Sequence, residues 1–233
     1  METKKNKNYD LIKADPGVTL EWQERKKTLT VRGTGRCELG EVRGDLQVRD
    51  SAGVTVRTVT GNARSRGTST LTAGSVGGSW AASHEDSTLT AESVGGWAWS
   101  YDTSTLNAGS VGGKARCWDD STLNAGSIGG KARSHDSSSL TAGSIGGDAV
   151  SLDRSTLTAE SVGGWAVRFD DSTLTAGSVA NRRSPPVRRF PPVEILPIDP
   201  NGPVEWPFEP EGAPVAILPI DDSGPIDWPF KSE

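Results

Sequence analysis

The sequence predicts an all-β protein: a right-handed single-stranded parallel β-helix, or β-solenoid, of about nine 17-residue coils with a Pro-rich C-terminal tail. Three observations predict this fold. The stretch STLTAGSVGG that begins at Ser69 returns six more times, with small changes, before Ser184. Gly, Ser and Thr dominate the repeats, and no helical apolar period is present in them. A repeat of this length is also too short for helical or leucine-rich solenoids.

The repeat length is measured between the leucines of successive copies. These are Leu71, Leu89, Leu106, Leu123, Leu140, Leu157 and Leu174. The first step is one residue longer than each of the others, which places an extra residue near Ser79. Val54 and Cys37 extend the register backwards in steps of 17. The array is therefore expected to begin near Thr28 and to be about 43 Å long at about 4.8 Å per coil.

Three regions follow from this pattern. Residues 1–27 are charged and lack the repeat, so they either cap the first coil or remain unstructured. Residues 28–181 form the predicted β-solenoid. Residues 182–233 contain 13 of the 14 prolines and form an acidic tail, in which PVEILPIDPNGPVEWPFEPEGA is echoed 22 residues later by PVAILPIDDSGPIDWPFKSE.

Composition narrows the class of protein. A hydrophobic content of 33% with 6% aromatic residues suits a thin solenoid core better than a conventional two-layer core. No apolar run is long enough for a transmembrane segment, and METKKNKNYD lacks the apolar part of a secretory signal. We therefore expect a cytoplasmic protein, with a virion location or export by another route as alternatives. Cys37 and Cys117 stand about four coils, or roughly 19 Å, apart, so they are expected to be free thiols.

Alternation of side chains gives each coil its inner and outer faces. It places Leu71 inward between the outward Thr70 and Thr72, and it places Val76 inward in the next segment. In a third segment the alanines exemplified by Ala98 point inward.

The outward residues of this third segment form the first candidate binding face. They change from coil to coil and interleave aromatic with basic side chains. They are Trp97, Trp99, Tyr101, Lys114, Arg116, Trp118, Lys131, Arg133, His135, Trp165 and Phe169. Such a face can bind a polyanion, a glycan or an acidic peptide by stacking and charge, unless it is a surface that drifted without function. The acidic tail is one candidate ligand, on its own coil stack or on a neighbouring copy.

The outward residues of the first segment form a second candidate, a ladder of hydroxyl and amide side chains. They are Thr70, Thr72, Thr88, Thr90, Thr105, Asn107, Thr122, Asn124, Thr156, Thr158, Thr173 and Thr175. Two parallel columns of this kind resemble the flat T-x-T arrays of ice-binding β-solenoids. Thr also favours strands and stacks well on itself, which explains the columns without a ligand.

An acidic column is the third feature. It consists of Asp50, Glu85, Asp102, Asp119, Asp136, Asp153 and Asp170. Asp before Ser or Thr at a bend commonly bonds its own backbone in a turn. Calcium binding between coils and a carboxylate pair of the kind found in retaining glycosidases are the alternatives.

A resemblance to one family is carried by GEVRGDLQVRD from Gly40 and VTGNARSRG from Val59. With a glycine ahead of an alternating strand in each repeat, these segments resemble bactofilins, polymer-forming bacterial cytoskeletal proteins with a right-handed β-helix between Pro-rich ends. The likeness covers roughly residues 28–181 and implies self-association. The Thr columns and the repetitive tail depart from that family, and no functional residue is carried over.

Taken from sequence, the expected function is that of a non-catalytic structural or interaction module. Such a repeat scaffold self-associates or binds a protein partner through a side face or its tail. The alternatives are an ice-binding protein that uses the Thr ladder and a virion or adhesin-type fibre component that binds a surface glycan. We expect no enzyme activity, no cofactor, no metal and no nucleic-acid partner.

Overall fold

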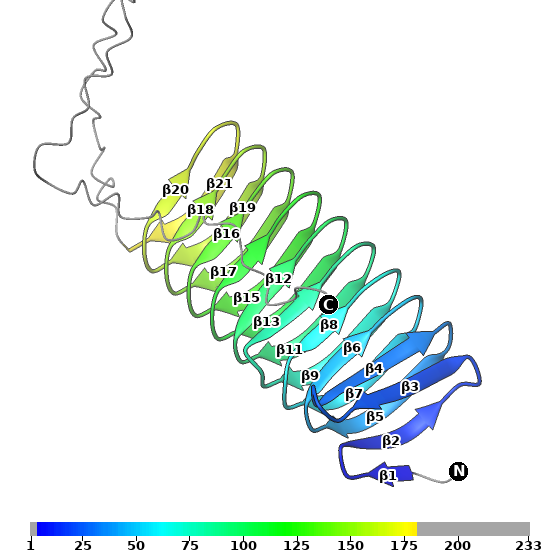
Figure 1. The fold of residues 1–233 in the computed structure, drawn as a ribbon. Coiled ribbons are helices and arrows are strands. Elements are labelled where there is room, and N and C mark those ends of the chain that lie inside the picture. Colours follow the sequence, from blue (N-terminus) through cyan, green and yellow to red (C-terminus); the bar gives the residue numbers. More distant parts are fainter. Residues whose placement is uncertain (1–3, 181–233) are drawn as a thin grey trace, which may run out of the picture. The chain divides into compact units, whose positions relative to one another are not determined.

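A computed structural model describes residues 4–180, which form 21 β-strands and no helix (Figure 1). Each coil contributes one strand to each of two sheets, named here sheet A and sheet B. Nine parallel strands in each sheet correspond to the nine predicted coils, and the predicted β-solenoid is confirmed. Nothing within the described residues is a helix long and apolar enough to cross a membrane.

The longer strands form sheet A, and the shorter strands form sheet B. In spatial order sheet A consists of β1 (Lys4–Asn6), β2 (Tyr9–Ala14), β5 (Arg36–Val42), β7 (Gly53–Val59), β9 (Thr70–Val76), β11 (Thr88–Val94), β13 (Thr105–Val111), β15 (Thr122–Ile128), β17 (Ser139–Ile145), β19 (Thr156–Val162) and β21 (Thr173–Val179). Sheet B consists of β20 (Ala166–Arg168), β18 (Ala149–Ser151), β16 (Ala132–Ser134), β14 (Ala115–Cys117), β12 (Trp97–Ser100), β10 (Trp80–Ser83), β8 (Ala63–Ser65), β6 (Asp45–Val48), β4 (Thr28–Gly33) and β3 (Val18–Gln23).

The register between coils is that of the sequence repeat. Leu89 pairs with Leu106, and Leu106 pairs with Leu123, so identical residues stack along the axis. All three leucines are fully buried. Because every coil presents the same inward column to its neighbours, a thin core of Leu, Val, Ile and Ala is continuous through the stack.

The extra residue lies at Ser79, as predicted. The N–H of Gly78 donates to the carbonyl of Gly61, one ordinary repeat earlier, at 2.9 Å. The N–H of Trp80 donates to Oδ1 of Asn62, one residue more than a repeat earlier, at 3.0 Å. The insertion therefore sits in the turn between the two sheets, and both sheets keep their pairing.

The first two predicted segments of each coil are one strand in the structure. In β9 the inward residues are Leu71, Ala73 and Val76, with Gly74 and Ser75 between the last two. Simple alternation would place one residue between inward positions, and here there are two. The extra residue bends the strand, and its pairing with β11 continues on both sides of the bend. Each coil consequently has one bent long strand and one short strand. The handedness of the coils stays a prediction.

Buried serines hold the turn that follows each sheet B strand. The Oγ of Ser83 lies 2.9 Å from the Oγ of Ser104 and 3.3 Å from that of Ser100, and Ser100 and Ser104 are 3.0 Å apart. All three are at most 1% exposed. Their hydroxyls are satisfied by one another and by backbone carbonyls, as buried polar groups require.

The two cysteines are free and buried, as expected. Cys117 occupies the column of buried serines, where it aligns with Ser100 and Ser134. Burial raises the pKa of the Cys37 thiol to about 11 and that of Cys117 to about 12.

The acidic column has the left-handed backbone conformation that the tight turn requires. Its φ angles lie between 53° and 63°, which is unusual for residues other than glycine but tolerated by Asp. Oδ2 of Asp102 accepts the N–H of Glu85 at 3.1 Å, so the carboxylate also links neighbouring coils. This geometry supports the turn interpretation. No group of three or more potential metal ligands occurs in residues 4–180.

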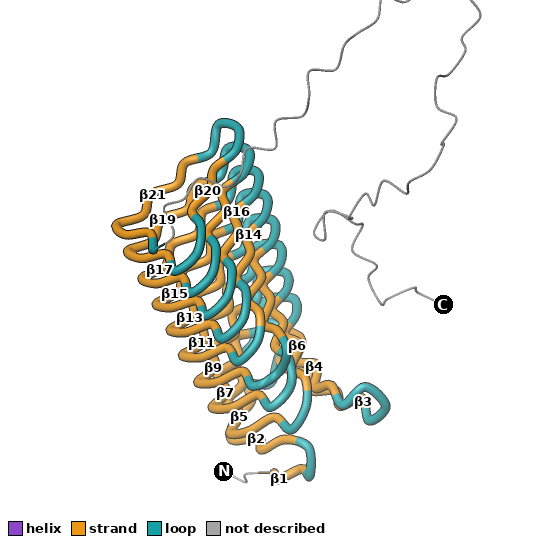
Figure 2. The backbone as a smooth tube through the Cα atoms, turned by 90° about the vertical axis from the view of Figure 1, so that its left-hand side faces the viewer, coloured by secondary structure: helices purple, strands orange, loops and turns teal. Residues whose placement is uncertain are grey.

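The first coil is covered by antiparallel strands. β2 pairs antiparallel with β5 in sheet A, and β3 pairs antiparallel with β4 in sheet B. β1 and β3 therefore end the two sheets at the same end of the stack (Figure 2). The tail predicted over residues 182–233 lies outside the described residues.

Candidate functional site on the outer face of sheet B

All eleven residues predicted for the first candidate face lie on the outer side of sheet B or in the turns on either side of its strands. We define the aromatic-basic face as Arg49, Arg64, Arg66, Trp80, His84, Trp97, Trp99, Tyr101, Lys114, Arg116, Trp118, Lys131, Arg133, His135, Trp165 and Phe169. Pairing stacks these residues in three outward columns, while the alternate residues such as Ala98 and Ala115 are fully buried.

The turn after each of the strands β10, β12, β14 and β16 fixes the position of one ring. The N–H of Tyr101 donates to Oγ of Ser104 at 3.2 Å, and the N–H of Ser104 donates to the carbonyl of Tyr101 at 3.2 Å. Asp102 between them has a φ of 59°. The same pair of bonds joins His84 to Ser87. Successive coils therefore place the ring at the same point, one strand spacing apart.

Four rings consequently form a continuous stack along the axis. The centroids of His84 and Tyr101 are 4.7 Å apart, those of Tyr101 and Trp118 are 4.5 Å apart, and those of Trp118 and His135 are 5.9 Å apart. The planes differ by 9°, 3° and 16° respectively. The ring faces are occupied by neighbouring rings, so the stack presents ring edges to a ligand. Stacking of a sugar or base on Tyr101 or Trp118, included in the sequence prediction, is therefore disfavoured.

A second aromatic cluster lies beside the stack and is covered by cations. Trp80 and Trp99 are stacked with centroids 6.1 Å apart, and Trp97 is tilted against Trp99 at 5.6 Å. The guanidinium carbon of Arg64 lies 5.1 Å from the centroid of Trp80, and Nζ of Lys114 lies 5.4 Å from that of Trp97. These are cation–π contacts, which hold the charged groups close to the sheet.

Three arginines gather at the N-terminal part of the aromatic-basic face. Burial, followed by repulsion from Arg66 and Arg49, lowers the pKa of the Arg64 guanidinium. The Nε atoms of all three arginines are buried and have no hydrogen-bond partner within residues 4–180. Arg49 also donates through Nη2 to Oε1 of Gln47 at 2.9 Å. Three like charges held this close repel one another, and an anion bound at the face would reduce that repulsion.

The histidines add no charge to this face near neutral pH. Burial, reinforced by Arg64 and Arg66, lowers the pKa of His84 to about 4. Burial and Arg133 likewise lower the pKa of His135. The positive charge of the face therefore comes from its arginines and lysines.

Positive charge is partly neutralised toward the C-terminal coils. Nζ of Lys131 lies 3.1 Å from Oδ2 of Asp148. The N–H of Trp165 donates to Oδ1 of Asp148 at 2.9 Å and is the main cause of the lowered pKa of that carboxyl group. The basic part of the face is therefore centred on the coils from Arg49 to Lys114.

The face predicted from the sequence left out five of its members: Arg49, Arg64, Arg66, Trp80 and His84. The signal was available, because Trp80 stands one repeat before Trp97 and His84 stands one repeat before Tyr101. Because of the extra residue at Ser79, counting back in steps of 17 misses the equivalent residues of the earlier coils by one position. The arginines of those coils therefore do not fall into the columns that such a count predicts.

The Thr ladder is present on the outer side of sheet A. Thr88, Thr105 and Thr122 pair in register, and so do the residues two positions later. Nδ2 of Asn124 donates to Oδ1 of Asn107 at 2.9 Å, which ties the centre of the second column together. The ladder is thus regular, and its binding of ice stays a prediction.

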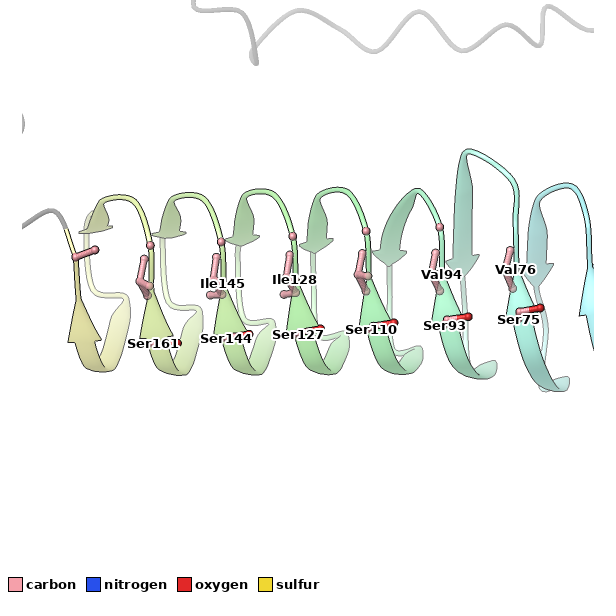
Figure 3. A pocket seen from close by; sticks show the side chains of 18 of the residues that line it. Ser75, Val76, Ser93, Val94, Ser110, Ser127, Ile128, Ser144, Ile145 and Ser161 are labelled. Atoms are coloured by element: carbon pink, nitrogen blue, oxygen red, sulfur yellow. The ribbon is translucent and has the colours of Figure 1, made fainter.

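A groove of about 920 Å³ follows the bend of the long strands, lined by the Ser-Val-Gly positions of seven coils (Figure 3). Glycine is required in its central coils: a Cβ at Gly129 would lie 2.5 Å from the carbonyl oxygen of Gly112. The groove therefore follows from close stacking of the coils. It carries no charged or aromatic side chain among the described residues that line it.

Comparison with protein-family models, curated proteins and solved structures found no match. The resemblance to bactofilins therefore stays a prediction, and functional inference depends on the geometry described above.

Proposed function

We propose that this β-solenoid is a non-catalytic interaction scaffold that binds an extended acidic polypeptide through its aromatic-basic face. The repeat scaffold itself is established by the parallel, in-register pairing of its coils. The observation that carries the proposal is the cluster of three neighbouring cations, Arg49, Arg64 and Arg66, beside a stack of ring edges.

The chemistry of this face favours anions over neutral ligands. Guanidinium groups form bidentate charge-assisted hydrogen bonds with carboxylates, and these are stronger than neutral hydrogen bonds. The edges of aromatic rings carry the positive part of the quadrupole, whereas the faces carry the negative part. Since the stacked rings of Tyr101 and Trp118 expose their edges, they reinforce the attraction of the neighbouring cations for a carboxylate.

The dimensions of the face favour a linear partner. From Arg49 to His135 it extends over five coil steps, or about 24 Å, and from Trp97 to Tyr101 its width is about 13 Å. This gives an area of about 300 Å², compared with about 800 Å² per partner in a standard interface between globular proteins. An extended segment of a few residues fits this area.

Rigidity supports the same function. The columns belong to strands paired on both sides, and each ring is fixed by a turn that buried serines hold. A preorganised face loses little conformational entropy when a ligand binds.

Titration of the full-length chain with a fluorescent Glu-Pro repeat peptide tests this function. The variant R64Q/R66Q/K114Q removes three charges from the face, and K13Q/R36Q/R57Q removes three from exposed positions on sheet A. We expect the face variant to bind at least about tenfold more weakly than the wild type, and the control variant to bind like the wild type. A Gln-Pro peptide should not bind. Equal loss of binding in both variants, or no binding by the wild type, would contradict the proposal.

A further inference from the structure

We infer that the acidic polypeptide is the C-terminal segment 192–233 of this chain, and that its two repeat units, 192–213 and 214–233, engage the aromatic-basic faces of two copies. This inference rests on the proposed function, because it names the ligand of the same face. The protein would then link its own copies through a contact between tail and face.

Charge complementarity is the first reason. Segment 192–233 contains nine acidic residues and a single basic residue, Lys231. The acidic residues are Glu194, Asp199, Glu205, Glu209, Glu211, Asp221, Asp222, Asp227 and Glu233. Opposite signs of charge speed association and align the partners, whereas tail–tail and face–face contacts repel.

The side-chain chemistry of the segment is the second reason. Each unit contains an ILPID element, at 195–199 and at 217–221, and a WPF element, at 206–208 and at 228–230. Proline-rich segments are preorganised ligands that dock against aromatic side chains at low entropic cost. The aromatic-basic face offers such side chains in Trp97, which is 43% exposed, and in the tryptophans beside it.

Two copies are involved because each chain carries two tail units but only one aromatic-basic face. The basic part of one face, from the coil of Arg49 to that of Lys114, is about 19 Å long, which an extended proline-rich chain of about six residues covers. A single face therefore accepts one ILPID or one WPF element, whereas each chain carries two units but only one face. The second unit needs the face of another copy. Because tail and face are different surfaces, the contact is heterologous and can continue from copy to copy.

Exchange of charges in the full-length chain tests this inference. The face variant R64E/R66E/K114E reverses three charges of the face, and the tail variant E205K/E209K/D222K/D227K reverses two charges in each unit. K13E/R36E/R57E is the matched control on sheet A. The readout is the weight-average mass by light scattering over a concentration series at low salt.

We expect the mass of the wild type and of the control to rise at least about twofold with concentration, because heterologous contacts do not close on themselves. Each of the two charge-reversed variants should remain monomeric. Their equimolar mixture should regain association, because the unaltered acidic tail of the face variant meets the unaltered basic face of the tail variant. Association of either variant alone, or a mixture that remains monomeric, would overturn the inference.

Failure of this inference is distinguishable from failure of the proposed function. If the Glu-Pro peptide binds the face but the mixture remains monomeric, the face binds acidic chains and the partner is another protein. If the peptide binds neither the wild type nor the tail variant, whose own tail no longer competes for the face, both proposals fall.

Discussion

The ring of Tyr101 lies flat on the ring of Trp118, with centroids 4.5 Å apart and planes 3° apart. This separation is close to the spacing of neighbouring strands, because each ring leaves the same position of the same turn one coil later. The repeat thus converts residues that stand one coil apart in sequence into a continuous aromatic column. The stability of the central coils should depend on that column.

Replacing Trp118 with Ala removes one of the two inner rings of the stack, together with two stacked contacts. We expect the free energy of unfolding to fall by about 3–5 kcal/mol, from lost burial and two aromatic pairs. Trp118→Phe keeps a ring at this position and should lose less than half as much. Urea unfolding followed by far-UV circular dichroism gives both values, and equal losses would show that a ring at this position does not stabilise the protein.

The left-handed backbone of the acidic column can be tested at Asp119, whose φ is 57°. Asp119→Gly should change the unfolding free energy by less than about 1 kcal/mol, because glycine adopts positive φ freely. Asp119→Val should destabilise by about 1–2 kcal/mol, because a β-branched residue is strained there. The midpoints of thermal unfolding compare the two variants. A valine variant as stable as the glycine variant would rule out strain at this turn.

Stability should decrease in mild acid because of His84. Its folded pKa is lowered to about 4 by burial and by Arg64 and Arg66, against an ordinary value of 6.5, and Asp102 opposes this only in part. The unfolded state therefore binds a proton first, so stability is complete above pH 6.5 and is lost as the pH falls toward 4. The pKa of His135 is also lowered by burial, so this residue contributes in the same direction.

His84→Phe is the matching variant, since it keeps a ring against Tyr101 and cannot be protonated. The difference between the urea midpoints at pH 7 and pH 4.5 should be smaller in this variant than in the wild type. An identical difference in both proteins would exclude His84 as the source.

Neither thiol should react in the folded protein. Cys37 and Cys117 are at most 3% exposed, and burial raises their pKa to about 11 and about 12. A thiolate-specific chromogenic reagent at pH 8 should therefore label no cysteine until denaturant is added, and then label both. Ser137→Cys, at an exposed turn position, provides a thiol that reacts at once. Labelling of the folded wild type would show that the stack opens locally.

The Thr ladder allows a direct test of ice binding. Thr122→Lys with Asn124→Lys places two long charged side chains at the middle of the ladder and breaks the Asn107–Asn124 hydrogen bond. If the ladder binds ice, the wild type should show thermal hysteresis in a nanolitre osmometer and the double variant should not. Absence of hysteresis in the wild type would end this alternative.

Much of the fold could be predicted because the leucine spacing reports the register directly. Residues at equivalent positions of successive repeats, such as Leu89 and Leu106, must pair when a chain coils once per repeat, and alternation then assigns the inner and outer faces. The extra residue at Ser79 was also visible as a single longer step. These features depend only on spacing.

The details of the candidate site could not be predicted in the same way. Alternation shows that Tyr101 and Trp118 point outward, but the orientation of their rings depends on the turn held by Ser104 and its equivalents. The outward neighbours of Ser100 imply that this serine points inward. Whether a buried serine stabilises the fold depends, however, on hydrogen-bond partners in the following turn and in the adjacent coil. Such contacts form between coils and leave no periodic signal of their own.

The near-identity of the coils also makes the length of the stack a variable quantity. Each coil from β9 onward meets its neighbours through the same paired columns, while β1 to β3 contact only the first coil. Loss or duplication of one repeat unit would therefore leave every remaining interface intact and shift the far end by about 4.8 Å. Repetitive DNA readily gains and loses such units during copying. The structure thus permits shorter and longer inherited forms of the protein, which differ in the length of the coil stack and keep the same fold.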